Sequence, residues 1–579
     1  MSKFSRIKIL RIVTFFALAI ITVRLFVIQI IEHDIWVAKA NEQHTLLETI
    51  TAKRGEIYMM DDGEPVPVVL NQTTYQVIID PAVADRESVE FTLKTHAKDY
   101  VTANLDEVYS VEGLRYYIVA KGVPYKKAAE IASAELPGVW LKSGNQRVYP
   151  EGEMGSTLLG FVNADGIGQY GVEGSLNKIL SGKDGLLKTV SDINNVALSI
   201  GNDNIKIPAE DGKNVVLSVD RGLEKMVEET LATHIENTPA TNAAALIMNP
   251  NTGEVIAMTS LPNYNPANYG NVKDAAAYIN QVTEIPYEPA SICKNFTFSA
   301  AINEGKMTAD TTYFNQGYEI IDGWKIMNAE QRASIYGTIT MKTALYWSLN
   351  TGSMHALMLL GDSENEITQV GRERLYDYYY NKFRLGRATG IELIEATGYI
   401  EDPNEGYGRD STYANMTFGQ NLGITMIQTA TAFSAVINGG YWRTPTIVKG
   451  TLENDRIIPL NTEKVEDHII SEGTSAMMRD MLINNRSYKV RGGIDRPGYA
   501  IGGKSGTAQV IVDGSYDDSM NNLVGSYIGF IGPEGELPQY VIMVKMWGEG
   551  QALSGGEAQD LFDTLSNRAI NYLKIKPNN

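Results

Sequence analysis

One pair of side chains in the middle of the chain could support acyl transfer through a covalent serine intermediate. Ser291 and Lys294 are three positions apart, so on a helix the serine hydroxyl and the lysine amine lie on one face. The amine can act as the base that activates the serine if burial or a second cation lowers the lysine pKa. Pro289 favours a helix start ahead of the serine, near the positive end of the helix dipole. Taken alone, this spacing also occurs on solvated helix surfaces that have no catalytic role.

Two later motifs strengthen the catalytic interpretation. Ser348 and Asn350 form a Ser-x-Asn motif, and a Lys-Ser-Gly-Thr motif follows it. This last motif consists of Lys504, Ser505, Gly506 and Thr507. Gly502 and Gly503 precede its lysine and fit a strand edge that a substrate backbone approaches closely. The order, spacing and composition of the three motifs resemble those of the active-site serine enzymes that recognise penicillin.

The resemblance covers nearly the whole chain and is specific to the class B penicillin-binding proteins, the monofunctional peptidoglycan transpeptidases. Further landmarks that carry it are residues 54–57, Arg147 with Tyr149 and Pro150, and residues 168–173, 249–257, 287–289 and 418–420. The resemblance implies an α/β fold in which an antiparallel sheet is flanked by helices. It also implies an elongated α+β pedestal ahead of the catalytic domain and one N-terminal transmembrane helix.

The resemblance also assigns roles to the first two motifs. Ser291 attacks the carbonyl of the penultimate D-alanine of a peptidoglycan stem peptide and expels the terminal D-alanine. Lys294 is the general base, Ser348 relays the proton to the leaving amine, and Asn350 holds a substrate amide through its side chain. The amine of a second stem peptide then attacks the acyl-enzyme and completes the cross-link. β-Lactams are expected to acylate the same serine.

The Lys-Ser-Gly-Thr motif is expected to bind the substrate carboxylate. Lys504 supplies positive charge there and can also depress the pKa of Lys294. Ser505 and Thr507 offer hydroxyl donors to the same carboxylate. The strand that follows offers an edge for the extended peptide to join. Backbone N–H groups of Ser291 and Thr507 would form the oxyanion hole, an interaction worth roughly 3 kcal/mol in comparable enzymes.

Length, charge and cysteine content exclude several classes of protein. The 579 residues exceed what one hydrophobic core usually organises, so two or more folded units are expected. With 50 Lys and Arg against 69 Asp and Glu, the net charge of -19 would repel a polyanion, and we expect no nucleic-acid partner. Cys293 is the single cysteine, which excludes a disulfide within the chain and a multi-cysteine metal cluster.

The N-terminal region predicts a membrane anchor. Residues 12–31 form an apolar run long enough to cross a bilayer as a helix. Basic residues precede the run while Glu32 and Asp34 follow it, so a cytoplasmic tail at 1–11 and an extracytoplasmic catalytic domain are expected. Arg24 must snorkel or face a partner, because a charge near mid-bilayer costs roughly 3 kcal/mol or more. The alternative, a cleaved signal peptide, lacks a small-x-small cleavage site after the run.

The clearest change in organisation falls near residues 211–212. We expect a pedestal at 35–212, with an inserted subdomain near 87–140, and a transpeptidase domain at 213–575. Residues 221–234 have helical spacing. Short apolar runs predict strands at 215–219, 243–248, 255–259, 527–531 and 540–546. Strands at both ends of a largely helical region imply a sandwich whose sheet is closed by the C-terminal strands.

Two residues depart from the pattern of the family. Ala290 stands where the family usually has glycine, and the simpler expectation is that it adopts ordinary helix-entry angles. Cys293 lies inside the Ser-x-x-Lys motif, turned away from the face shared by Ser291 and Lys294. One interpretation is a buried apolar cysteine; the other is a zinc ligand, with His355 and a carboxylate as partners. The acyl-transfer chemistry itself requires no cofactor.

Other functions are compatible with the same motifs. A β-lactamase or a carboxypeptidase lets water reach the acyl-enzyme, but neither normally carries an anchored pedestal. A non-catalytic penicillin sensor or a scaffold of cell-wall complexes could retain the fold, although intact Ser291, Lys294 and Lys504 argue against a loss of catalysis. By resemblance, the anchor and pedestal pair with a polytopic polymerase of lipid-linked glycan in the cytoplasmic membrane. Division, elongation and sporulation enzymes of the family share these motifs.

Overall fold

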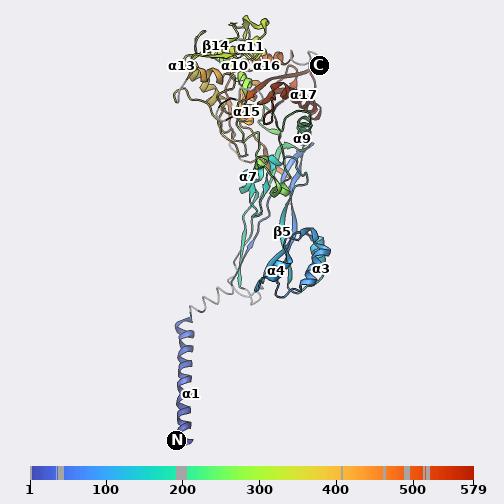
Figure 1. Cartoon of the computed structure of the whole chain (residues 1–579), viewed down its shortest axis with the longest axis vertical. Helices are drawn as coiled ribbons and strands as arrows, with labels where there is room; N and C mark the ends of the chain where they lie inside the picture. Colours follow the sequence, from blue (N-terminus) through green and yellow to red (C-terminus); the bar gives the residue numbers. More distant parts are fainter. Residues whose placement is uncertain are drawn as a thin grey trace. The chain divides into compact units, whose positions relative to one another are not determined.

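The protein is described from a computed structural model (Figure 1). It describes residues 3–33, 36, 45–190, 205–405, 409–460, 464–487, 496–512, 515–516 and 522–578. The chain forms two compact units. One comprises Met1–Gly55 with Ser181–Gly212, and the other comprises Glu56–Leu180 with Lys213–Asn579.

The first unit contains the apolar N-terminal helix and a small sheet. Helix α1 (Lys3–Phe26) runs into the π-helical turn η1 (Val27–Ile31). Across Ile7–Ile31 it is long and apolar enough to cross a membrane, and its apolar side chains are exposed. Strands β1 (Thr45–Ile50), β8 (Gly185–Val190) and β9 (Ile205–Ile207) pair in the antiparallel order β1-β8-β9.

In the second unit, one sheet joins strands from both sides of the predicted boundary near residue 212. Its order is β19-β18-β10-β2-β3-β4, with β5 paired to β3. Strand β10 pairs in parallel with β2 and antiparallel with β18, so the chain returns to this sheet twice after leaving it. The strands are β2 (Ile57–Asp61), β3 (Glu64–Ile79), β4 (Tyr117–Pro124), β5 (Val139–Val148), β10 (Asn214–Asp220), β18 (Val448–Glu453) and β19 (Arg456–Ile458).

A buried ion pair accounts for two of the sequence landmarks in this region. Arg147 on β5 donates from Nε to a Glu173 carboxylate oxygen 2.7 Å away, and both side chains are buried. A second guanidinium nitrogen donates to the side-chain oxygen of Asn71, 2.8 Å away. Glu173 lies on the short helix α7 (Gly171–Ser175), so this pair ties β5 to the helical segment that follows it.

Three helices between β3 and β5 build a small separate core. Helices α3 (Arg86–His96), α4 (Leu105–Ser110) and α5 (Tyr125–Ala132) lie against β3, β4 and β5 (Figure 1). Apolar side chains such as Val89, Leu93 and Val119 are buried between them. The spacing of Val89 and Leu93 places both on one face of α3, which is the amphipathic pattern of a helix packed on a sheet.

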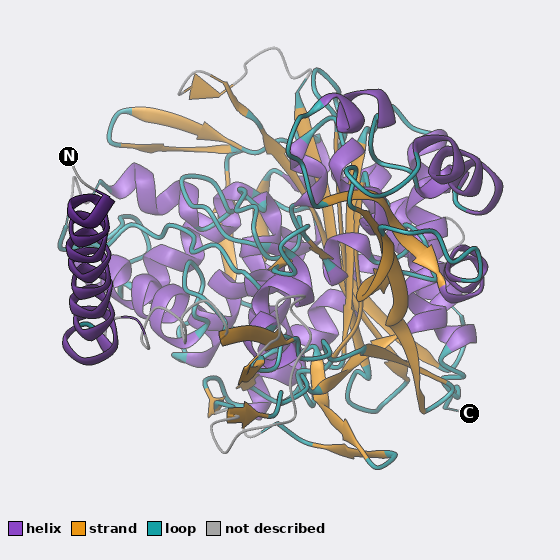
Figure 2. Cartoon of the chain, turned by 90° about the horizontal axis from the view of Figure 1, so that it is seen from below, coloured by secondary structure: helices purple, strands orange, loops and turns teal. Residues whose placement is uncertain are grey.

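The Lys-Ser-Gly-Thr motif belongs to a five-stranded antiparallel sheet in the order β12-β11-β25-β24-β21. Its strands are β11 (Asn242–Met248), β12 (Val255–Leu261), β21 (Tyr499–Gln509), β24 (Leu523–Pro533) and β25 (Tyr540–Trp547). The pairing of β11 with β25 closes the sheet with C-terminal strands, as the sequence predicts. Helices cover both faces of the sheet (Figure 2), which confirms the predicted α/β architecture.

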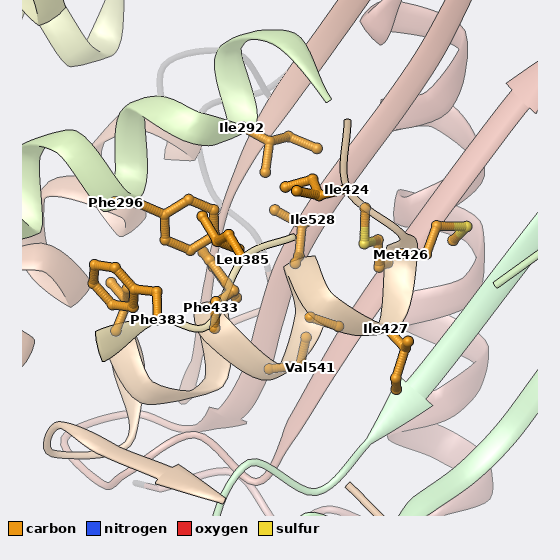
Figure 3. Close-up of a cluster of buried hydrophobic side chains, with 14 of the residues drawn as sticks. Ile292, Phe296, Phe383, Leu385, Ile424, Met426, Ile427, Phe433, Ile528 and Val541 are labelled. Atoms are coloured by element: carbon orange, nitrogen blue, oxygen red, sulfur yellow. The ribbon is translucent and has the colours of Figure 1, made fainter. Parts of the chain in front are cut away.

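Two apolar cores hold the helices to this sheet. Helices α9 (Arg221–Glu236) and α17 (Gly555–Tyr572) cover one face through residues such as Leu223, Val544 and Phe562. On the other face, Phe296, Phe433 and Ile528 belong to the larger core, and Figure 3 shows them in one cluster. The helices of that face are α10 (Lys294–Asn303), α11 (Met341–Tyr346), α12 (Asn350–Leu360), α13 (Gln369–Tyr376), α14 (Asp410–Met416), α15 (Met426–Ile437) and α16 (Glu472–Ser487).

Candidate active site

Ser291 lies in a tight turn that leads into α10. The 3₁₀ turn η5 (Ala290–Cys293) runs directly into the helix, so Ser291 and Lys294 share one face as predicted. The expectation of ordinary helix-entry angles at Ala290 is wrong, because its φ is 48°, in the left-handed region. Its N–H donates to the carbonyl oxygen of Gly419 at 3.1 Å. A Cβ on Gly419 would lie 2.1 Å from the Ala290 oxygen, so close backbone packing against this glycine holds the strained conformation.

The amine of Lys294 is surrounded by four oxygen atoms. Its Nζ lies 2.9 Å from Ser291 Oγ, 2.6 Å from the carbonyl oxygen of Ser348, 3.3 Å from Ser348 Oγ and 2.9 Å from Asn350 Oδ1. The carbonyl and the amide oxygen can only accept hydrogen bonds. A neutral amine has two N–H bonds, which these two acceptors occupy, so its lone pair is left for the hydroxyl proton of Ser291. The geometry therefore suits a base that takes this proton.

Asn350 is oriented by contacts on both sides of its amide. Oδ1 accepts from Lys294, and Nδ2 donates to the carbonyl oxygen of Met327 at 2.9 Å. Met327 ends β15 (Trp324–Met327), which forms a hairpin with β14 (Tyr318–Ile321). The amide nitrogen carries two hydrogens, so this contact leaves the second hydrogen for the expected substrate amide.

Strand β21 carries the Lys-Ser-Gly-Thr motif past the segment that holds Ser291. A Cβ on Gly506 would lie 2.4 Å from the carbonyl oxygen of Pro289, so only glycine permits this approach. Lys504 is fully buried and donates to the Ser505 carbonyl oxygen at 2.9 Å. Thr507 Oγ1 accepts from the N–H of Gly555 at 2.8 Å, so its own hydroxyl hydrogen can be donated towards the cleft.

A cleft of about 970 Å³ lies over these residues. It is lined by Ser291, Ser348, Asn350, Ser505 and Thr507 among the residues predicted from sequence. Lys294 and Lys504 are buried beneath its floor. The sequence analysis did not find another part of the rim. It consists of Trp324 to Met327 on β15, Asn328 to Glu330 after that strand, and Arg409, Ser411, Thr412 and Asn415 at α14. An exposed tryptophan next to an Asp-Gly turn was the available signal for that rim.

Cys293 and His355 lie in different surroundings from those of a metal centre. Cys293 is fully buried in the apolar core, and burial raises the pKa of its thiol. The His355 ring stacks on Tyr313 at 5.1 Å between centroids, and burial lowers the pKa of the imidazole. Within the described part of the chain, no group of three His, Cys, Asp or Glu side chains is placed to hold a metal ion. These residues therefore do not assemble the zinc site that the sequence left open.

A further lysine behind the site was missed by the sequence analysis. Lys545 on β25 is 2% exposed, and burial lowers the pKa of its amine to about 7. Its Nζ lies 4.7 Å from the ring centroid of Tyr287 and 4.5 Å from that of Trp547. Strand pairing places Lys545 beside Ser526, which in turn pairs with Gly506. Lys545 thus lies in the same row across the sheet as Gly506, two strands away, with β24 between them.

Comparisons with known proteins agree with this arrangement. Residues 243–567 match the penicillin binding protein transpeptidase domain, and residues 49–217 match the penicillin-binding protein dimerisation domain. The stage V sporulation protein D of Bacillus subtilis is 28% identical over 539 residues, covering 91% of this chain and 79% of that protein. The peptidoglycan D,D-transpeptidase FtsI of Escherichia coli is 24% identical, covering 97% and 90%. The crystal structure of penicillin binding protein 2X from Streptococcus thermophilus has a TM-score of 0.71 at 24% identity, covering 91% and 80%.

Proposed function

The chain belongs to the penicillin-binding proteins with a transpeptidase domain, and from this membership we propose the roles of its site residues. It is a serine-type peptidoglycan D,D-transpeptidase and a target of β-lactams. The observation that carries the proposal is the 2.9 Å contact between Lys294 Nζ and Ser291 Oγ, with two obligate acceptors on the same amine. This contact supports Ser291 as the nucleophile and Lys294 as its base.

Acylation then proceeds from the pair. Ser291 Oγ forms a bond to the carbonyl carbon of the penultimate D-alanine while its proton passes to the Lys294 amine. The oxyanion is stabilised by the backbone N–H groups of Ser291 and Thr507. Collapse breaks the peptide bond, and the proton moves from Lys294 through the Ser348 hydroxyl to the leaving amine of D-alanine. The 3.3 Å separation of Lys294 Nζ and Ser348 Oγ supports this relay.

The acceptor step reverses the direction of proton transfer. The amine of a second stem peptide attacks the ester carbonyl and gives its proton through Ser348 to Lys294. The ester C–O bond breaks, and Lys294 returns the proton to Ser291 Oγ. Lys504, Ser505 and Thr507 hold the carboxylate of the donor during acylation. The available hydroxyl hydrogen of Thr507 and the position of Lys504 directly beneath the cleft support that role.

The chain is anchored in a membrane by its N-terminal apolar helix. We place its N-terminus in the cytoplasm and the catalytic domain outside, because basic residues precede the helix and acidic residues follow it. A polytopic glycan polymerase in the same membrane is the proposed partner. Arg24 on α1 is the residue proposed to face it, since a lone arginine is costly within lipid. A reporter fused after Asn579 tests the orientation, and activity in the cytoplasm would refute it.

Intact-mass spectrometry of the full chain after incubation with a penicillin tests the catalytic assignment. We expect a covalent adduct on wild type and on Ser363→Ala, a control serine outside the cleft, and none on Ser291→Ala. We expect Lys294→Met to slow acylation by at least about 100-fold, because general base catalysis contributes that much or more. An adduct that persists on Ser291→Ala would exclude Ser291 as the nucleophile. A non-catalytic sensor would acylate but release no D-alanine from stem peptides, so product release separates that alternative.

A further inference from the structure

A second cavity of about 720 Å³ opens beside the active-site cleft. Thr412, Asn421 and Gln509 line both spaces, so the cavity adjoins the cleft at the end of β21. None of the roles proposed above uses this cavity. Its position next to the catalytic strand suggests that it receives part of the substrate.

The walls of the cavity are held in place by backbone hydrogen bonds. Tyr287 and Ile424 exchange hydrogen bonds of 3.1 and 3.0 Å, and Tyr399 and Gly423 exchange bonds of 2.7 and 3.0 Å. The N–H of Asn421, a residue with φ of 57°, donates to a Glu288 carboxylate oxygen at 2.8 Å. These segments therefore form a preformed wall that carries the Glu288 carboxylate.

The charge of the cavity lining is negative. Among the described residues that line it, Glu288 and Glu401 are the acidic ones, and none is Lys, Arg or His. The backbone of Glu401 is fixed because its carbonyl oxygen accepts from the Tyr413 hydroxyl at 2.5 Å. Two carboxylates beside a partly enclosed space favour a cationic group, and a charged hydrogen bond formed there is stronger than a neutral one.

The direction of β21 determines which part of the substrate reaches this cavity. β21 is an edge strand, and it is buried from Ala500 to Lys504, so a peptide can join its edge only from Ser505 onward. With the terminal carboxylate at Ser505 and Thr507, the upstream residues of the peptide run towards Gln509. At about 3.3 Å per residue, one or two upstream residues reach the mouth of the cavity.

We propose that this cavity is a donor subsite for the amine-bearing side chain of the stem peptide, upstream of the alanine that acylates Ser291. Cross-linking requires an amine on the acceptor, and donor and acceptor are both stem peptides, so the donor carries the amine-bearing residue as well. The carboxylate of Glu401 binds its ammonium group, and the carboxylate of Glu288, which accepts from the N–H of Asn421, adds negative charge to the wall. This inference rests on the proposed roles of Ser505 and Thr507 in the cleft.

Competition against a fluorescent penicillin tests the subsite on the full chain in detergent. The competitors are Nα-acetyl-Xaa-D-Ala-D-Ala peptides in which Xaa is lysine, Nε-acetyl-lysine or norleucine. We expect the lysine peptide to halve the labelling rate at a concentration at least about tenfold lower than either neutral peptide needs. In Glu401→Gln this ratio falls towards one. In Glu405→Gln it stays as in wild type, because Glu405 does not line the cavity. The ratio compares two peptides on the same variant, so a general loss of activity in that variant does not alter the ratio.

The outcomes separate this inference from the assignment of the nucleophile. Equal potency of the three peptides on wild type, or no slowing by any of them, would overturn the subsite while penicillin labelling still supports Ser291. An unchanged ratio in Glu401→Gln would overturn it as well. A failure of wild type to take up the penicillin would instead count against the proposed function.

Discussion

Replacement of Lys545 by methionine is expected to stabilise the protein at neutral pH. Burial lowers the pKa of the Lys545 amine from 10.5 to about 7. Between these values the unfolded chain binds a proton that the folded chain does not, so the free energy of unfolding rises with pH across this window. Each pH unit contributes about 1.4 kcal/mol, and the whole window amounts to about 5 kcal/mol. Near pH 7 almost all of this gain is absent, because the folded amine becomes charged there.

Methionine fills a similar volume without a charge. The faces of the Tyr287 and Trp547 rings partly offset the cost of burying the ammonium, by about 2 kcal/mol. We therefore expect Lys545→Met to be more stable than wild type at pH 7 by on the order of 3 kcal/mol. The difference should shrink as the pH rises towards 9, because the wild-type amine is then neutral.

Thermal unfolding of the full chain in detergent at pH 7, 8 and 9 measures this difference. Lys342→Met serves as the control, since Lys342 is exposed on α11 and should give the wild-type dependence on pH. Other titrating groups are common to the variants, so they cancel in the comparison. The reasoning would be refuted if the Tm of Lys545→Met at pH 7 did not exceed that of wild type and if both proteins showed the same change in Tm between pH 7 and 9.

Three further substitutions test other parts of the structure. Ala290→Gly should raise the free energy of unfolding by about 1 kcal/mol, because a φ of 48° strains alanine; a lower Tm would contradict the strain. Gly506→Ala should slow penicillin acylation by about 100-fold, since the new Cβ would displace β21 from Pro289, and acylation at the wild-type rate would show that the strand can yield. Arg147→Met should destabilise the protein by about 3–5 kcal/mol, because it leaves the carboxylate of Glu173 buried without its arginine. A midpoint of chemical denaturation unchanged from wild type would refute this.

The three motifs were accessible to sequence reasoning because each combines residue types with a spacing that one element imposes. Ser291 and Lys294 needed only the periodicity of a helix. The predicted strands at 243–248 and 540–546 fall within β11 and β25, since short apolar runs determine them locally. The α/β fold and the contact between Ser291 and Lys294 could therefore be predicted.

Features that depend on contacts between distant segments could not be predicted. The φ of Ala290 is set by the backbone of Gly419, and nothing local to Ala290 indicates that approach. Lys545 sits in an apolar strand, where its burial and its aromatic neighbours depend on the pairing of β25 and on the segment ahead of the nucleophile. The environment of His355, stacked on Tyr313, likewise comes from a strand far from it in the sequence.

The sheet shared by β2, β10 and β18 limits how this enzyme can be recombined with its relatives. These three strands come from different parts of the chain, yet the backbone of β10 hydrogen-bonds to both β2 and β18. A chimera joined between β2 and β10 would pair strands whose side chains were selected in different proteins. A chain beginning after β10 would lack β2 as well, and it would leave β18 with an open edge that invites association with other molecules. The catalytic domain should therefore be exchanged between relatives only together with β2 and β18, the two strands that flank β10.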